Sequence, residues 1–253
     1  MQESSWPSNC TETLYDICLD YVALNLDSTV FCESADGQLV LKSDLFLPTH
    51  ICDALLSRLR PVGRELLPLF ASPTAINFRH INLKSVTDLT NAELHGVLAH
   101  HPTDLRISSE QLTADSIGLI SSESHNLQTL HIVKCENIFS KKLQSKKHVW
   151  KKNLHVRHLA KKGIRFHCPK ARYVALCGLQ SNTSEILCFM LADLTLLTRL
   201  DLSQSNIDLQ HLHVALSQLQ KLQILSLYSV KLEPNLRDAF EAIAQVKSLR
   251  SVM

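Results

Sequence analysis

A repeated pattern of aliphatic and polar positions runs through most of the chain. From about residue 75 onward, the spacing Leu-x-x-Leu-x-Leu-x-x followed by Cys or a small residue fits segments beginning at Leu127, Leu197 and Leu222. Each copy is predicted to add one short strand to a parallel sheet, because a repeat can bury its leucines only against its neighbours. Equivalent positions lie 24 or 25 residues apart, at Ile81 to Leu105, Leu105 to Leu130, Ala175 to Leu200 and Leu200 to Leu225.

A period of this length is typical of leucine-rich repeats, so the predicted fold is an α/β leucine-rich-repeat solenoid of about five to six units over residues 63–253. The return segments, such as Leu209 to Leu219, are expected to form helices on the convex side. Cys135 occupies the position where such repeats place Asn or Cys, whereas later copies carry Ser205 and Val230. The stretch 249–253 resembles the start of another strand, so we expect an uncapped edge there, in a short form or a piece of a longer protein.

The pattern before the repeats is helical. Residues 1–10 are predicted to be a tail, and 11–62 a helical region. Thr13 is a good N-cap with Asp16 three positions later, which predicts a capping box, and the helix should end near Leu24. Residues 38–41 are predicted to be a short extended piece. One face of the first helix is predicted to carry Leu14, Cys18, Tyr21 and Val22.

A second helix is predicted to begin at Pro48, because proline suits the first helical turn, and to end by Pro61. Its apolar stripe consists of Ile51, Leu55, Leu56 and Leu59. The thiols of Cys18 and Cys52 are both expected to lie inside packed helices, where cysteine behaves as a small hydrophobic residue. These two helices are expected to cap the N-terminal end of the array.

Composition narrows the possible functions. The 253 residues contain only 6 Gly, too dispersed for a phosphate-binding loop, and no nucleophile elbow or metal-binding His pair stands out. The 8 Cys form no regular framework, and the chain lacks an apolar secretion signal or a stretch long enough to span a membrane. We therefore expect reduced thiols, a cytoplasmic or nuclear location, no cofactor and no catalytic residues.

Charge is uneven along the chain. The net charge is +2, but residues 141–172 contain 12 Lys or Arg and no Asp or Glu. This basic insertion has three possible interpretations, which are a solvated surface helix, a nuclear-import or nucleic-acid-binding patch, and an unfolded or atypically spliced segment. Its crowded His155, His158, His167 and Cys168, with Cys135 and Cys177 further away, match no zinc-finger spacing, so no metal site is predicted.

The two N-terminal segments resemble known docking motifs. Residues 13–22 are similar to the elongin-C-binding box, and the Leu47-Pro48-x-x-Ile51-x-x-x-Leu55 pattern is similar to the cullin-2 box. Together, and followed by leucine-rich repeats, they resemble the Zyg-eleven/Zer-one family of cullin-2 ubiquitin ligase substrate receptors. The resemblance implies that elongin C contacts Thr13, Leu14, Cys18 and Val22, and that cullin-2 contacts Leu47, Pro48, Ile51 and Leu55.

By this resemblance, the chain is expected to be a substrate-receptor or adaptor subunit of an elongin B/C–cullin-2 RING ubiquitin ligase, with partners that include elongin B/C, cullin-2 with its RING protein, and a protein substrate. Thr49-His50 favours cullin-2, because the cullin-5 pattern prefers a second proline at position 50. The armadillo-like region with which family members bind glycine degrons has no counterpart here. The alternative is a protein-binding scaffold outside any ligase, in which the helices only cap the repeats; the basic insertion could bind nucleic acid in either case.

Overall fold

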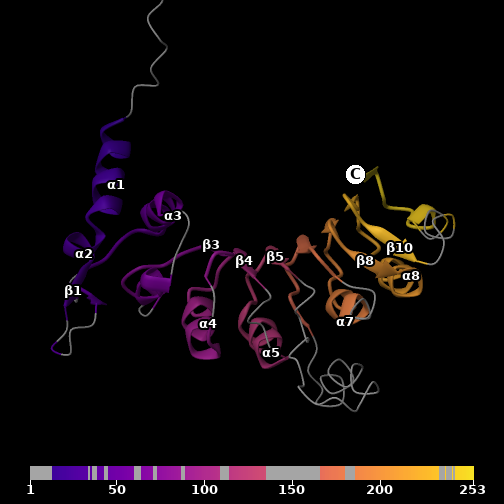
Figure 1. Cartoon of the computed structure of the whole chain (residues 1–253), viewed down its shortest axis with the longest axis horizontal. Helices are drawn as coiled ribbons and strands as arrows, with labels where there is room; N and C mark the ends of the chain where they lie inside the picture. The colour runs from indigo at the N-terminus through magenta and orange to yellow at the C-terminus, as the bar shows by residue number, and fades with distance from the viewer. Residues whose placement is uncertain are drawn as a thin grey trace, which may run out of the picture.

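The main feature of the computed structural model is a parallel sheet, with seven strands in the part of the chain that is described (Figure 1). The described residues are 13–33, 35, 39–42, 45–59, 64–70, 73–86, 89–108, 114–134, 166–179, 186–233, 237, 241 and 243–253. The strands, in order across the sheet, are β3 (His80–Leu83), β4 (Asp104–Ser108), β5 (Thr129–Val133), β6 (Tyr173–Leu176), β7 (Arg199–Asp201), β9 (Ile224–Ser226) and β11 (Ser251–Val252).

Helices alternate with the strands and lie on one side of the strand row (Figure 1). They are α4 (Asn91–Leu98), α5 (Ala114–Glu123), α7 (Ile186–Leu191) and α8 (Leu209–Ser217). A small second parallel sheet pairs β8 (Asn206–Asp208) with β10 (Lys231–Glu233). The α/β architecture is thus confirmed, and the alternation of parallel strands and helices is consistent with leucine-rich-repeat-like units.

Alternate side chains of the strands point toward the helices, which places the core between the sheet and the helices. The inward side chains are at most 1% exposed and comprise Ile81, Leu83, Leu105, Ile107, Leu130, Ile132, Val174, Leu176, Leu200, Leu202 and Leu225. The pairs Ile81–Leu105, Leu105–Leu130 and Leu200–Leu225 confirm most of the predicted spacing. The equivalence of Ala175 and Leu200 was wrong by one residue, because Val174 pairs with Leu200 and Ala175 pairs with Asp201 on the opposite face.

The repeats that contain β5, β6, β7, β9 and β11 begin with the same turn. The backbone N–H of Leu127 donates to the carbonyl of Ser124 at 3.1 Å, and that of Ala171 donates to Cys168 at 3.0 Å. Phe166, Cys168 and Ala171 are each 1% exposed and belong to the core. Residues 166–172, which the charge pattern assigned to the basic insertion, therefore form part of a repeat; residues 141–165 lie outside the described part of the chain.

The N-terminal region contains α1 (Leu14–Leu24), α2 (Leu26–Thr29), the antiparallel pair β1 (Phe31–Glu33) and β2 (Leu39–Leu41), α3 (Thr49–Arg58) and the 3-10 helix η1 (Arg64–Phe70). The end of α1 and the extended piece at β2 are as predicted, and α3 begins one residue later than expected, with Pro48 as its N-cap rather than in its first turn. The strand expected near the end of the chain is also present, as β11. No helix among the described residues is both long and apolar enough to cross a membrane.

Candidate functional site

Helix α1 begins with the predicted capping box. The Thr13 hydroxyl accepts a hydrogen bond from the Asp16 N–H at 3.2 Å, and the Thr13 N–H donates to Asp16 Oδ2 at 3.3 Å. Both interactions satisfy groups that the first helical turn would otherwise leave unpaired. The hydrogen bonds from Thr13, together with Arg58, lower the pKa of Asp16, because they favour its charged form.

Contacts with α3 decide which face of α1 points outward. Arg58 of α3 pairs with Asp16 through Nη2 and with Asp20 Oδ1 through Nε at 2.7 Å. On the same side of α1, Leu19 is 5% exposed, and Val22 and Ala23 pack against the core. The ion pairs and the buried leucine together fix the rotation of α1 about its axis.

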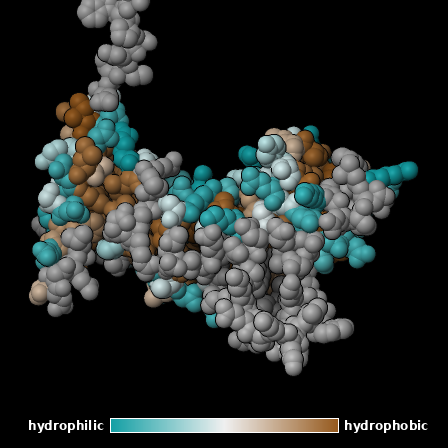
Figure 2. Space-filling model, viewed as in Figure 1, coloured by the Kyte–Doolittle hydropathy of each residue, from teal (hydrophilic) through white to brown (hydrophobic). Residues whose placement is uncertain are grey.

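The opposite face of α1 is apolar and uncovered. Leu14 is 77% exposed, Ile17 51%, Tyr21 63% and Leu24 85%, and Cys18 is also exposed. These residues are spaced three or four apart, so they form one continuous row along the helix, which we call the α1 stripe. Figure 2 shows hydrophobic surface gathered over this helix at the upper left. Such a row matches the anchors with which an amphipathic helix enters a hydrophobic groove.

The predicted elongin-C-binding residues divide between the two faces. Thr13 caps the helix, while Leu14 and Cys18 belong to the α1 stripe. Val22 lies on the other side, half-buried against the core. The expectation that Cys18 lies inside a packed helix was wrong, because α3 packs against the Leu19 side of α1 instead.

The α1 stripe also contains apolar residues that the motif does not include, Ile17 and Leu24. Ile17 follows Leu14 by three residues and Leu24 follows Tyr21 by three residues, and this spacing could have predicted that both lie on the same face.

The predicted cullin-2-binding residues contribute largely to the protein's own packing. Leu55 is 1% exposed, and Leu47 and Ile51 are half-buried against the core. Leu47 also bridges to Ile76 and donates its N–H to the Ala75 carbonyl at 3.0 Å. Of the four motif residues, only Pro48 is well exposed.

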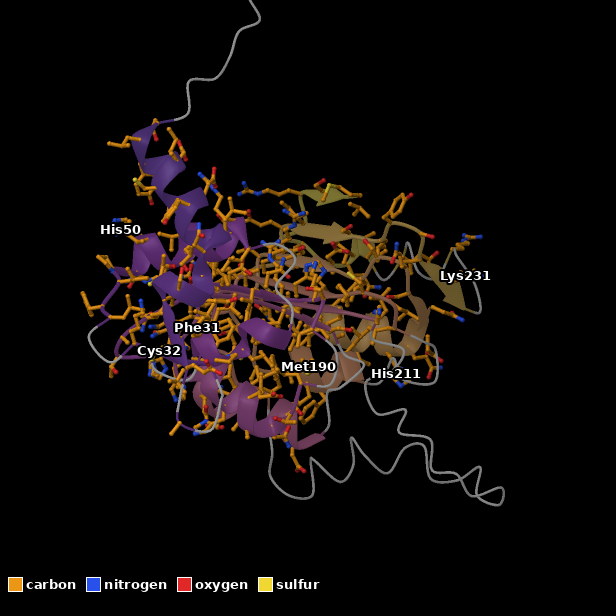
Figure 3. All side chains as sticks on the ribbon, turned by 60° about the vertical axis from the view of Figure 1, so that its left-hand side comes forward. Phe31, Cys32, His50, Met190, His211 and Lys231 are labelled. Carbon is orange, nitrogen blue, oxygen red and sulfur yellow. The ribbon has the colours of Figure 1, made fainter. Side chains whose placement is uncertain are left out.

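Beside Pro48, the segment leading into α3 has two further exposed side chains. Phe46 is 73% exposed, and His50 is exposed at the outer edge of the N-terminal region (Figure 3). The thiol of Cys52 is buried as expected, and burial raises its pKa. A partner that binds α3 would therefore contact its N-terminal end rather than its apolar stripe, which packs against the core.

The face of the sheet opposite the helices is polar. Lys84 Nζ lies 3.1 Å from His131 Nδ1, and Arg106 donates two hydrogen bonds to Asp104, at 3.1 and 2.9 Å. Burial, reinforced by Lys84 and Arg106, lowers the pKa of His131 to about 4, so its imidazole is neutral at pH 7. This face offers directional hydrogen bonds and mixed charge rather than an apolar surface.

No cluster of three or more potential metal ligands occurs within the described ranges. Cys168 is buried, which raises its pKa to about 12, and His167 is exposed. Cys135, His155 and His158 lie outside the described residues.

Comparisons with known proteins add a distant relationship. No family model matches the chain. Residues of this chain are 29% identical over 143 positions to the protein zer-1 homologs of Homo sapiens and Pongo abelii, and 28% identical to that of Mus musculus. The chain is a distant homologue of these proteins. The alignment covers 52% of this chain, which spans only 18% of each zer-1 homolog. The predicted resemblance to Zer-one proteins is confirmed at this level.

Proposed function

We propose that this chain is a non-catalytic substrate-receptor or adaptor subunit of an elongin B/C–cullin-2 RING ubiquitin ligase. The observation that carries the proposal is the α1 stripe, since five neighbouring apolar side chains at one helix face remain exposed while Leu19 and the ion pairs with Arg58 anchor the opposite face. The distant relationship to zer-1 homologs supports the same assignment. A subunit of this kind would contribute orientation, bringing a target close to the ubiquitin-transferring partners.

In this proposal, elongin C receives the α1 stripe, with Leu14 as the large anchor and the Cys18 thiol beside it. The capping residue Thr13 sets the start of the helix, and Val22 supports the helix from its inner side. Cullin-2 contacts the N-terminal end of α3 around Pro48 and His50, while Leu47, Ile51 and Leu55 hold that end in place from beneath. The target protein binds the polar face of the sheet opposite the helices, which we call the open face, or a region outside this chain.

The test is direct binding of the purified chain to purified elongin B/C. Replacing Leu14→Ala and Cys18→Ala together removes apolar area worth about 2–3 kcal/mol when buried, so we expect affinity to fall by roughly 30-fold to 150-fold. Val214→Ala is the matched control, because Val214 is an apolar side chain of α8 that is 46% exposed. Both variants should melt at the wild-type temperature.

Two results would overturn the assignment. One is absence of measurable affinity between the wild-type chain and elongin B/C. The other is equal affinity for the double variant and for Val214→Ala. If elongin B/C binds, adding cullin-2 or cullin-5 to the complex tests the preference drawn from Thr49-His50, and we expect cullin-2 to join.

A second candidate function is a scaffold in which the N-terminal helices serve only as a cap. The observation in its favour is that Cys52, Leu55 and Leu56 bury the apolar stripe of α3 within the core. A chain of this kind would bind its partner through the open face alone and would have no affinity for elongin B/C. The same binding experiment therefore separates the two functions.

A further inference from the structure

One backbone arrangement recurs at the start of almost every strand of the main sheet. The N–H groups of Thr103 and Asp104 both donate to the Arg79 carbonyl, at 2.9 and 3.0 Å. Those of Gln128 and Thr129 both donate to the Thr103 carbonyl, each at 2.9 Å. The arrangement continues through the sheet at the carbonyls of Gln128, Arg172, Thr198 and Gln223. One carbonyl of each repeat thus accepts two N–H groups from the next.

The first strand needs a different acceptor, because β3 is the edge of the described sheet. The equivalent donors there are the N–H groups of Arg79 and His80. Both donate to Asp53 Oδ1 of α3, at 2.9 and 3.1 Å, and the other carboxylate oxygen lies 3.0 Å from His80 Nδ1. A side-chain oxygen therefore occupies the place that a repeat carbonyl occupies elsewhere.

We infer that Asp53 is a positioning residue that substitutes for the missing preceding repeat and fixes α3 to the edge of the sheet. The Asp53 side chain is only 18% exposed, and its carboxylate accepts two hydrogen bonds from backbone N–H groups, which a charged acceptor strengthens. Cys52 and Leu56, on either side of it along α3, are at most 3% exposed and hold the helix against the core. The backbone bond from Leu47 to Ala75 anchors the chain just before the helix.

The consequence for function follows from the contacts of α3. Because Arg58 binds α1 and Asp53 binds the start of β3, helix α3 links the orientation of the α1 stripe to the repeats. If the ligase assignment holds, Asp53 sets the angle at which the open face is presented to the ligase. That consequence rests on the proposed function, whereas the positioning itself does not.

The first measurement is amide hydrogen exchange on the full chain, resolved at Arg79 and His80. Asp53→Ala leaves both N–H groups without their acceptor, so we expect their exchange to accelerate by about tenfold or more, while the amides of β7 and β9 are unchanged. Asp53→Asn retains an acceptor oxygen and should restore most of the protection. Asp27→Ala, an exposed aspartate in α2, is the control and should change neither amide.

The second measurement separates positioning from general stability. Spin labels attached through non-canonical residues at the exposed positions Ser57 and Lys221 report the distance between α3 and the far part of the sheet. The distance distribution should broaden in Asp53→Ala and remain as in the wild type in Asp27→Ala. If Asp53→Ala does not fold, Asp53→Ser provides the same comparison, since serine is too short to reach both amides.

Wild-type protection at Arg79 and His80 in the alanine or serine variant would overturn the inference. So would an acceleration spread evenly over all strands with an unchanged distance distribution, because that indicates only a loss of global stability. Neither measurement involves elongin B/C, so its outcome is independent of whether the Leu14→Ala and Cys18→Ala experiment supports the ligase function.

Discussion

The buried imidazole of His100 gives the protein a stability that depends on pH. His100 is 1% exposed and its ring packs against those of Phe70 and Phe78, with centroid distances of 5.6 and 5.3 Å. The Phe78 N–H donates to its Nδ1 at 3.4 Å, and its Nε2 lies 3.3 Å from the Phe70 carbonyl, which a neutral ring protonated at Nε2 satisfies. Burial lowers the pKa of His100 from 6.5 to about 4.

The direction of the pH dependence follows from this difference in the pKa of His100 between the unfolded and the folded chain. Between pH 6.5 and about 4, the unfolded chain binds a proton at this residue and the folded chain does not, so lowering the pH favours unfolding. The stabilisation by the neutral imidazole is fully present above pH 6.5 and is lost as the pH falls. A difference of this size corresponds to about 3 kcal/mol of unfolding free energy between pH 7 and pH 4.

The perturbation that tests this reasoning is His100→Gln, because glutamine keeps a donor and an acceptor but cannot bind a proton. Urea unfolding at several pH values between 4 and 7 should show a shallower decline than in the wild type, by as much as about 1.4 kcal/mol per pH unit. His50→Gln makes the same chemical change at an exposed site. An equal decline in the wild type and His100→Gln would refute the reasoning.

Two further predictions concern the anchoring of α1. Leu19→Ala should lower the unfolding free energy by about 2–4 kcal/mol in chemical denaturation, because it opens a cavity beneath the helix, whereas Tyr21→Ala on the exposed face should have little effect. Thr13→Ala should cost about 1 kcal/mol of helix stability by removing the capping box, and hydrogen exchange in the first turn of α1 should accelerate; unchanged protection at Asp16 would contradict the role of the cap.

The sequence predicted local structure well wherever one short signal decides it. The capping pair Thr13 and Asp16 gave the start of α1, and Pro48 gave the start of α3. The repeat period predicted the parallel strands, because leucines that recur at a fixed spacing are typical of leucine-rich repeats, whose strands lie side by side. The error at Ala175 arose because a period constrains the register only to within a residue, and a shift of one residue moves a side chain to the other face.

The pattern of hydrophobic and polar residues could not predict which side of α1 is buried. The helix is apolar on two sides, with Leu19 and Ala23 on one and Leu14 and Tyr21 on the other. Hydrophobicity alone therefore cannot tell which side is buried. The choice depends on α3, which packs against the Leu19 side and whose Arg58 pairs with Asp16 and Asp20, and these long-range contacts have no signature within the α1 segment.

The boundary of the basic insertion was misjudged for a related reason. Counting charges from 141 to 172 hid the apolar residues Cys168 and Ala171, which have the same spacing of three as Leu194 and Leu197 in the next repeat. Charge describes the surface, whereas membership of a repeat depends on the few positions that face inward. The spacing of these small residues was the signal that could have extended the array to residue 166.

The ladder across β5 and β6 also bears on how such a chain can change over evolutionary time. Leu130 and Val174 are 44 residues apart, compared with 24 to 26 for the neighbouring pairs, and yet they stand opposite each other in the same register. The crossing between these strands thus accommodates some twenty additional residues without any shift of the ladder. New sequence can accumulate at this point, and acquire a role of its own, without the rest of the protein having to be remodelled around it.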